Sequence, residues 1–133
     1  MVALVPEEKL IQFPADRSLG ELYTLSESGA TSFVGEAIGT VKVPFNADLA
    51  LYFSFDQISG CQPLTRVAPN LLTAVSFLGT DISDIDLEHV GKLTKLRELD
   101  ISCTEVGDSG LPHLELLSDL RRLNLSSTKI TNA

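Results

Sequence analysis

"LRELDISCTEVGD" (residues 96–108) has two related copies in the chain, and this recurrence decides the fold prediction. "LTAVSFLGTDISD" (72–84) stands 24 residues earlier, and "LRRLNLSSTKITN" (120–132) stands 24 residues later. A fixed period of this length is the signature of a repeat architecture. The matched columns are Leu72/Leu96/Leu120, Val75/Leu99/Leu123, Phe77/Ile101/Leu125, Thr80/Thr104/Thr128, Ile82/Val106/Ile130 and Asp84/Asp108/Asn132.

The repeats are unequal in completeness, and they occupy only the second part of the chain. We predict a degenerate copy at 48–71, full copies at 72–95 and 96–119, and a truncated copy at 120–133. In the degenerate copy, Asp48 and Asp56 replace the expected Leu and Thr. Residues 1–47 do not repeat, and their β-rich stretches predict a small β-structured N-terminal cap.

Each repeat divides into two halves with different periodicity. The segment LxxLxL ends with alternating apolar residues, which predicts a short strand with one buried face. The second half, for example Leu87, Val90 and Leu93, has a spacing of three, which predicts a short helix. Asp84 and Asp108 precede these helices, where a carboxylate is expected to cap free N–H groups. The column threonines are expected to bond backbone groups in the turn that follows each strand.

The pattern LxxLxLxxTx(I/V)xDxxLxxLxxL resembles the leucine-rich repeat family. It is most similar to the bacterial form of the cysteine-containing class, which has repeats of about 24 residues, here with Thr in the ladder position. The resemblance implies an α/β fold, namely a short right-handed solenoid with a parallel concave sheet and convex helices. It also implies a non-catalytic module that binds a protein partner through the concave face.

Charge and composition limit the classes of partner. Eighteen acidic and ten basic residues give a net charge of −8, which disfavours nucleic acid and anionic membranes. The start of the chain has no signal-peptide pattern, and no stretch approaches a membrane span. Cys61 and Cys103 fit no metal spacing and are expected to be free thiols. These observations predict a cytoplasmic protein without a cofactor.

The motifs of catalysis and metal binding are poorly represented. His89 and His113 stand one repeat apart, but their neighbours do not supply the three or four ligands that zinc requires. The nucleophile-elbow motif GxSxG does not occur in the sequence. We therefore expect no enzymatic activity, and a hydrolase or metal site in the N-terminal cap is the weakest alternative.

The candidate binding residues are those that the repeat leaves free on alternate strand positions. Tyr52 and Phe55 begin this face, and two readings stay open for them: an exposed apolar patch, or a surface covered by the N-terminal cap. The predicted concave-face residues are Tyr52, Phe55, Ser76, Leu78, Glu98, Asp100, Cys103, Arg122 and Asn124.

The truncated last repeat suggests a second kind of contact. It has a strand but no following helix, so one edge of the sheet and one side of the core are expected to be bare. The alternative function is therefore a self-assembling unit, a homodimer through the C-terminal edge. The residues predicted for this contact are Leu120, Leu123, Leu125 and Ile130.

Overall fold

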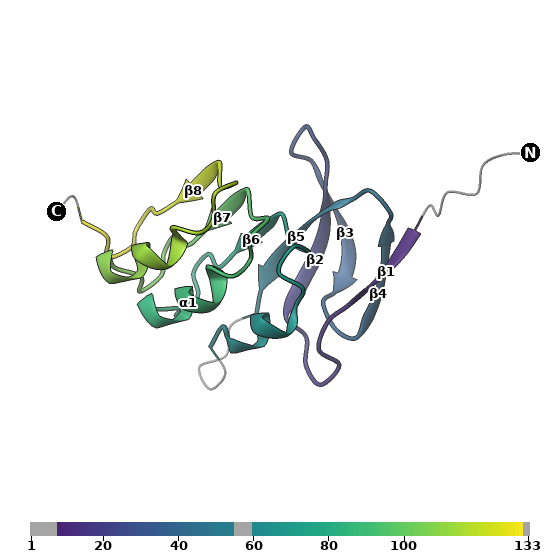
Figure 1. The fold of residues 1–133 in the computed structure, drawn as a ribbon, viewed down its shortest axis with the longest axis horizontal. Helices are drawn as coiled ribbons and strands as arrows, with labels where there is room; N and C mark the ends of the chain where they lie inside the picture. Colours follow the sequence, from purple (N-terminus) through teal and green to yellow (C-terminus); the bar gives the residue numbers. More distant parts are fainter. Residues whose placement is uncertain (1–7, 55–59, 132–133) are drawn as a thin grey trace, which may run out of the picture.

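Two β-sheets and a line of short helical segments form the part of the chain that the computed structural model describes, residues 8–54 and 60–131 (Figure 1). The strands are β1 (Glu8–Gln12), β2 (Gly20–Leu25), β3 (Thr31–Glu36), β4 (Thr40–Pro44), β5 (Asp48–Phe53), β6 (Ala74–Ser76), β7 (Glu98–Asp100) and β8 (Arg122–Asn124). The helical segments are η1 (Gln62–Arg66), η2 (Asp84–Asp86), α1 (Leu87–Val90) and η3 (Asp108–Leu114), of which only α1 is an α-helix.

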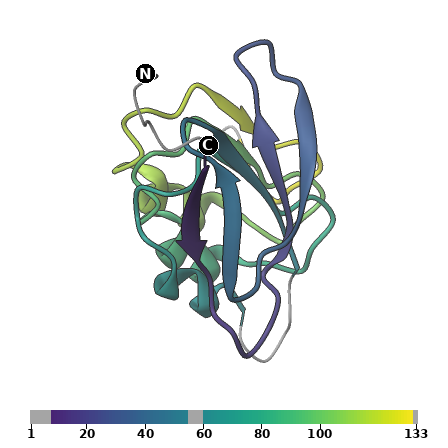
Figure 2. The same ribbon diagram turned by 90° about the vertical axis from the view of Figure 1, so that its right-hand side faces the viewer.

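The larger sheet has six strands in the order β3-β2-β5-β6-β7-β8. Strand β2 runs antiparallel to both of its neighbours, whereas β5 to β8 are parallel in chain order. Strands β1 and β4 form a separate antiparallel pair. Seen from the end, the helical segments lie on one side, and the β2–β3 hairpin projects at the other (Figure 2).

The matched apolar columns form the core of the repeats. Leu72, Leu96, Phe77 and Ile101 each have 0% of their surface exposed, and they pack in one apolar cluster with residues of β2 and β5. Phe77 lies 5.3 Å from Phe53 between ring centroids. Complete burial of such side chains contributes about 1.5–3 kcal/mol each, so this cluster is the main source of stability.

The turn after each repeat strand is closed by the column threonine. The hydroxyls of Thr80, Thr104 and Thr128 donate to the carbonyls of Phe77, Ile101 and Leu125 at 2.7, 2.6 and 2.8 Å. This confirms the expected role of the threonines. The residue before each threonine has a positive φ, which is +71° for Gly79 and +56° for both Cys103 and Ser127. Only Gly adopts this conformation at little cost, so the tight turn strains the other two.

The column aspartates connect neighbouring repeats. Asp84 Oδ1 accepts the N–H of Gly107 at 2.6 Å, and Asp108 Oδ1 accepts the N–H of Thr131 at 2.8 Å. Two bonds of Thr131 to Asp108 hold the pKa of that carboxyl below its usual value. The prediction that Asp84 and Asp108 cap their own helices is therefore wrong. At the start of η2, Asp86 instead accepts the N–H of Ser83 at 3.0 Å.

The prediction of a short solenoid with a parallel concave sheet and convex helices is also wrong. The larger sheet is mixed, and its antiparallel strands β2 and β3 come from the segment predicted as a cap. Within the described residues, α1 is only four residues long, and the other helical segments are 3-10 turns. Gly110 and Pro112 inside η3 explain part of this, because both residues disfavour an α-helix interior.

The bond between Asp84 and Gly107 predicts a measurable loss of stability on substitution. We expect Asp84→Ala to lower the free energy of unfolding by about 1–3 kcal/mol, because the N–H of Gly107 would lose its partner in a half-buried site. Urea unfolding followed by circular dichroism measures the change. Asp119→Ala removes the same charge from an exposed position and is the control, with an expected change below about 0.5 kcal/mol. Equal losses in the two variants would contradict the assignment.

Candidate functional site: the open face of the sheet

One face of the six-stranded sheet is free of helical segments, and we call it the open face. On β5, for example, Leu49 and Leu51 point into the core, whereas Tyr52 is 50% exposed on the other side. Strand pairing aligns its side chains in two rows across the sheet. The first row is Glu36, Glu21, Tyr52, Ser76, Asp100 and Asn124, and the second is Phe33, Tyr23, Ala50, Ala74, Glu98 and Arg122.

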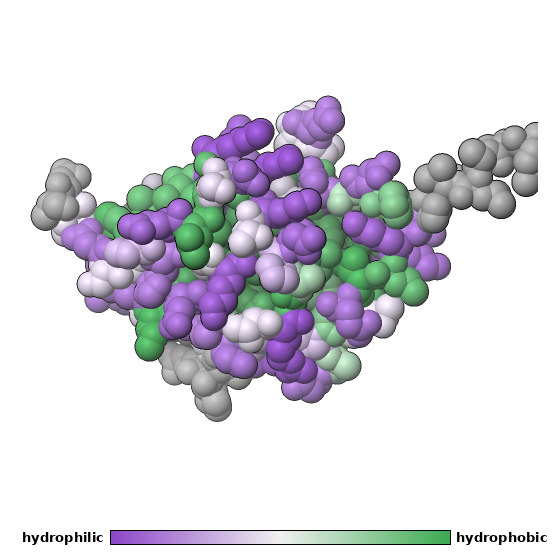
Figure 3. Space-filling view, in the orientation of Figure 1, coloured by the Kyte–Doolittle hydropathy of each residue, from purple (hydrophilic) through white to green (hydrophobic). Residues whose placement is uncertain are grey.

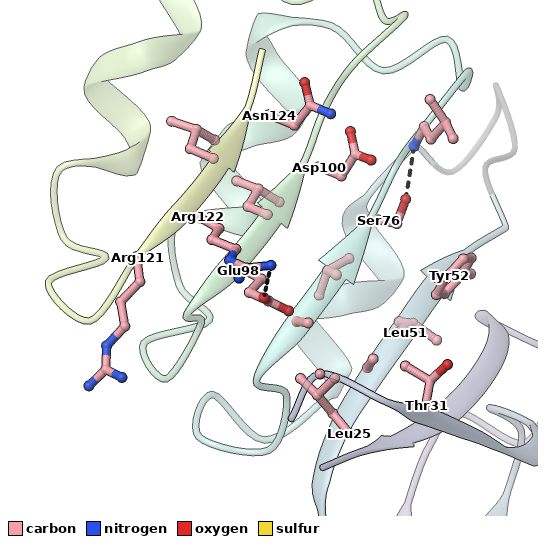
Figure 4. A pocket seen from close by; sticks show the side chains of 17 residues that line it. Leu25, Thr31, Leu51, Tyr52, Ser76, Glu98, Asp100, Arg121, Arg122 and Asn124 are labelled. Atoms are coloured by element: carbon pink, nitrogen blue, oxygen red, sulfur yellow. Dashed lines mark hydrogen bonds and ion pairs between the residues drawn. The ribbon is translucent and has the colours of Figure 1, made fainter. Parts of the chain in front are cut away.

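A groove of about 770 Å³ crosses the open face. Its floor contains the small side chains of Ala50, Ala74 and Ser76. Residues of the β2–β3 hairpin, namely Leu25, Gly29 and Thr31, line the groove together with Tyr52, and the opposite side is formed by β7 and β8 (Figure 4). Small floor residues between larger neighbours make the hollow, because side chains on one sheet face otherwise fill the space above it.

Seven of the nine predicted binding residues line this groove. Tyr52 and Leu78 are 50% and 59% exposed. Cys103 lies outside the groove in the turn after β7, and Phe55 lies outside the described residues. The seven residues are Tyr52, Ser76, Leu78, Glu98, Asp100, Arg122 and Asn124.

Three of these residues also hold the turns after their strands. Asp100 Oδ1 accepts the N–H of Ser102 at 2.9 Å, and Asn124 Oδ1 accepts the N–H of Ser126 at 3.0 Å. Ser76 Oγ accepts the N–H of Leu78 at 3.3 Å in the equivalent position. A side chain that bonds its own backbone two residues on is a common turn device. These three side chains are therefore partly occupied by structural hydrogen bonds, which lowers their freedom to reach a ligand.

The charged groups of the groove are partly paired. Arg122 approaches Glu98 at 3.5 Å, and Arg97, beside the groove, approaches Asp48 at 3.7 Å. All four side chains are at least one-third exposed, so each pair contributes little to stability. Arg121 points away from the strands (Figure 4). The groove thus has a rim of acidic and basic side chains above a floor of small, mostly apolar side chains.

The predicted self-association residues are placed around β8. Leu120, Leu125 and Ile130 are half-buried and pack against the core, whereas Leu123 is 38% exposed. On the face of Figure 3, hydrophilic side chains predominate, with apolar patches between them.

The repeat pattern does not indicate the hairpin residues of the groove. Leu25, Gly29 and Thr31 reach it because β2 pairs with β5, and this pairing joins residues that are far apart in the chain. The alternation in "GELYTL" (20–25) indicates a strand, but it does not indicate which other strand this one pairs with.

Metal-binding clusters and membrane-spanning helices were sought in the described parts of the chain. Residues 8–54 and 60–131 contain no group of three His, Cys, Asp or Glu side chains placed to hold a metal ion. No helix within these ranges combines the length and the apolar character of a membrane span.

A family model described as "Leucine Rich repeat" matches residues 92–111, which include β7 and the start of η3. The match supports the resemblance to leucine-rich repeats. Such repeats are typically protein-interaction modules without catalytic activity, so the match indicates an interaction module in general terms. No curated protein and no solved structure matches the chain.

The two thiols differ in environment, and we predict a difference in reactivity. Cys61 is 0% exposed, and burial, followed by the charge of Asp86, raises the pKa of its thiol. Cys103 is exposed. Because the thiolate is the reactive form, we expect Ellman's reagent at pH 8 to modify one thiol in the folded protein and the second only after unfolding. Cys103→Ser should abolish the fast phase, and Cys61→Ser should retain it. Equal rates for both thiols would contradict this assignment.

Proposed function

We propose that this protein is a non-catalytic protein-interaction module that binds a segment of a partner in the groove of the open face. The observation that carries the proposal is the groove itself, floored by Ala50 and Ala74 between the β2–β3 hairpin and β8. Protein-binding surfaces typically combine a few exposed apolar anchors with a polar rim. Tyr52 and Leu78 have the exposure of such anchors, and Glu98 and Arg122 belong to the rim.

The finer features of the family resemblance belong to the same proposal. We infer repeats of the bacterial, cysteine-containing-like class with boundaries at 48–71, 72–95, 96–119 and 120–133, preceded by the segment 1–47. We also infer a cytoplasmic location and a protein partner rather than nucleic acid or membrane. The net charge of −8 supports this choice of partner, because phosphate groups would be repelled.

A peptide-selection experiment tests the groove. We expect a displayed library of random peptides to yield binders of the wild-type protein, and Ser76→Arg to weaken their binding at least about tenfold by filling the floor. Gln62→Arg introduces the same charge at an exposed position on η1 and should leave the affinity within about twofold. Circular dichroism establishes that both variants are folded. If the selected peptides bind Ser76→Arg as well as wild type, the groove is not the binding site.

Self-association through the edge of β8 is the second candidate function. β8 is the terminal strand of the described six-stranded sheet, and Leu123 on it is 38% exposed. A terminal strand presents unpaired N–H and C=O groups that can pair with another strand. This supports a homodimer that joins two β8 strands and buries Leu123 together with parts of Leu120, Leu125 and Ile130.

Light scattering tests the dimer at micromolar protein concentration. We expect a mass of twice 14.4 kDa for wild type and of one chain for Leu123→Lys, which introduces a charge at the edge. Leu123 is preferred to Leu125 for this substitution because Leu125 packs against the core. The reverse exchange, Lys92→Leu, is made at an exposed position in the turn after α1 and should not change the mass. A monomeric wild type excludes the dimer.

A further inference from the structure

Three aromatic rings form a row on the antiparallel half of the open face. Tyr23 of β2 stands between Phe33 of β3 and Tyr52 of β5, with ring-centroid distances of 5.3 and 5.1 Å. Phe33 is 60% exposed and Tyr52 is 50% exposed. Aromatic side chains of this size usually contribute most to stability when they are buried. A row of them left at the surface therefore points to a binding surface.

Two glutamates flank this row on the same face. Glu21 and Glu36 are direct cross-strand partners in the β2–β3 ladder, and Glu21 is also opposite Tyr52 in the β2–β5 ladder. Like charges in direct opposition destabilise a sheet. Within the described residues, neither glutamate forms a salt bridge. The sheet thus carries a local excess of negative charge beside exposed aromatic rings.

The charge of Glu21 already affects its aromatic neighbour. Burial by the surrounding side chains, followed by the negative charge of Glu21, raises the pKa of Tyr23 above its ordinary value. A cation at this place would be favoured by both glutamates and by the negative faces of the rings. The guanidinium group of arginine combines these requirements, because it is planar, stacks on aromatic rings and bonds carboxylates with two N–H groups.

We propose that Tyr23, Phe33, Tyr52, Glu21 and Glu36, together the aromatic–acidic strip, bind an arginine side chain of an extended basic segment in a protein partner. The strip lies outside the matched leucine-rich repeat. Tyr52 also lines the groove, so this inference rests on the proposed function in that one partner would occupy both surfaces. The overall net charge of −8 attracts a basic segment and repels nucleic acid, which otherwise also stacks on aromatic rings.

The chain offers a local reporter for this binding. It contains no Trp and only two Tyr, and both tyrosines belong to the strip. Tyrosine fluorescence therefore reports the strip directly. The probe is an acetylated and amidated hexapeptide of alternating Val and Arg, and its counterpart carries citrulline, a neutral isostere, in place of Arg. We expect a saturable change in tyrosine emission with the arginine peptide, weakened by 0.5 M NaCl, and none with the citrulline peptide.

Charge-matched variants separate recognition by the strip from general attraction. Glu21→Gln/Glu36→Gln should weaken binding of the arginine peptide about tenfold, because it removes both carboxylates while keeping their shape. Glu88→Gln/Glu115→Gln removes two exposed carboxylates from the helical side and should change the affinity less than about twofold. The strip variant should also be at least as stable as wild type in urea, because it relieves the opposition of two charges.

Two outcomes would overturn the proposal. Equal weakening by both double variants would mean that net charge alone attracts the peptide, and equal binding of the citrulline peptide would mean that no cation is recognised. Either result leaves the groove proposal intact if peptides selected from the library still lose affinity for Ser76→Arg. The converse result is a library that yields no peptide for the groove while the arginine peptide still binds the strip. That result would contradict the groove proposal and support the strip proposal.

Discussion

The antiparallel pairing of β2 with β5 is the interaction on which the rest of this structure depends. It extends over six residues of each strand, from Gly20 opposite Phe53 to Leu25 opposite Asp48. Through it, β2 and β3 continue the sheet of the repeats, and Leu22 enters the same core as Leu51 and Phe77. The pairing also satisfies the edge of β5, which would otherwise present unpaired backbone groups. Gly20 is required at its end, because a Cβ there would lie 1.9 Å from the carbonyl oxygen of Tyr52.

The same pairing creates the two surfaces with functional interest. It places the β2–β3 hairpin beside the parallel strands, so that Leu25 and Thr31 line a groove with Tyr52 and Arg122. It also aligns Tyr23 between Phe33 and Tyr52. An interaction module built in this way presents side chains from two different kinds of strand pairing. A partner segment that crosses the strands would meet aromatic rings first, then small residues, and then charged residues.

Within the parallel half, a small set of polar side chains maintains the repeat. Each column threonine closes a turn within its own repeat, and the aspartates reach the next one. Because these groups bond backbone N–H and C=O groups, they satisfy positions that no strand ladder covers. The short helical segments then need only to cover the apolar columns. This explains why the repeat that has the 3-10 segment η3 in place of a regular helix still buries Leu114 and Leu117, which are 8% and 5% exposed.

The sequence by itself determined the repeat period, the apolar columns that become the core, the turn threonines and seven of the residues that line the groove. These features follow from local periodicity, since side chains alternate along a strand regardless of its neighbours. Only the tertiary structure decided that β2 joins the repeat sheet, that Asp84 bonds Gly107, and that Tyr23 meets Tyr52. Each of these contacts joins residues more than 20 positions apart, and no local pattern specifies which strand edge or which neighbouring turn a segment will meet.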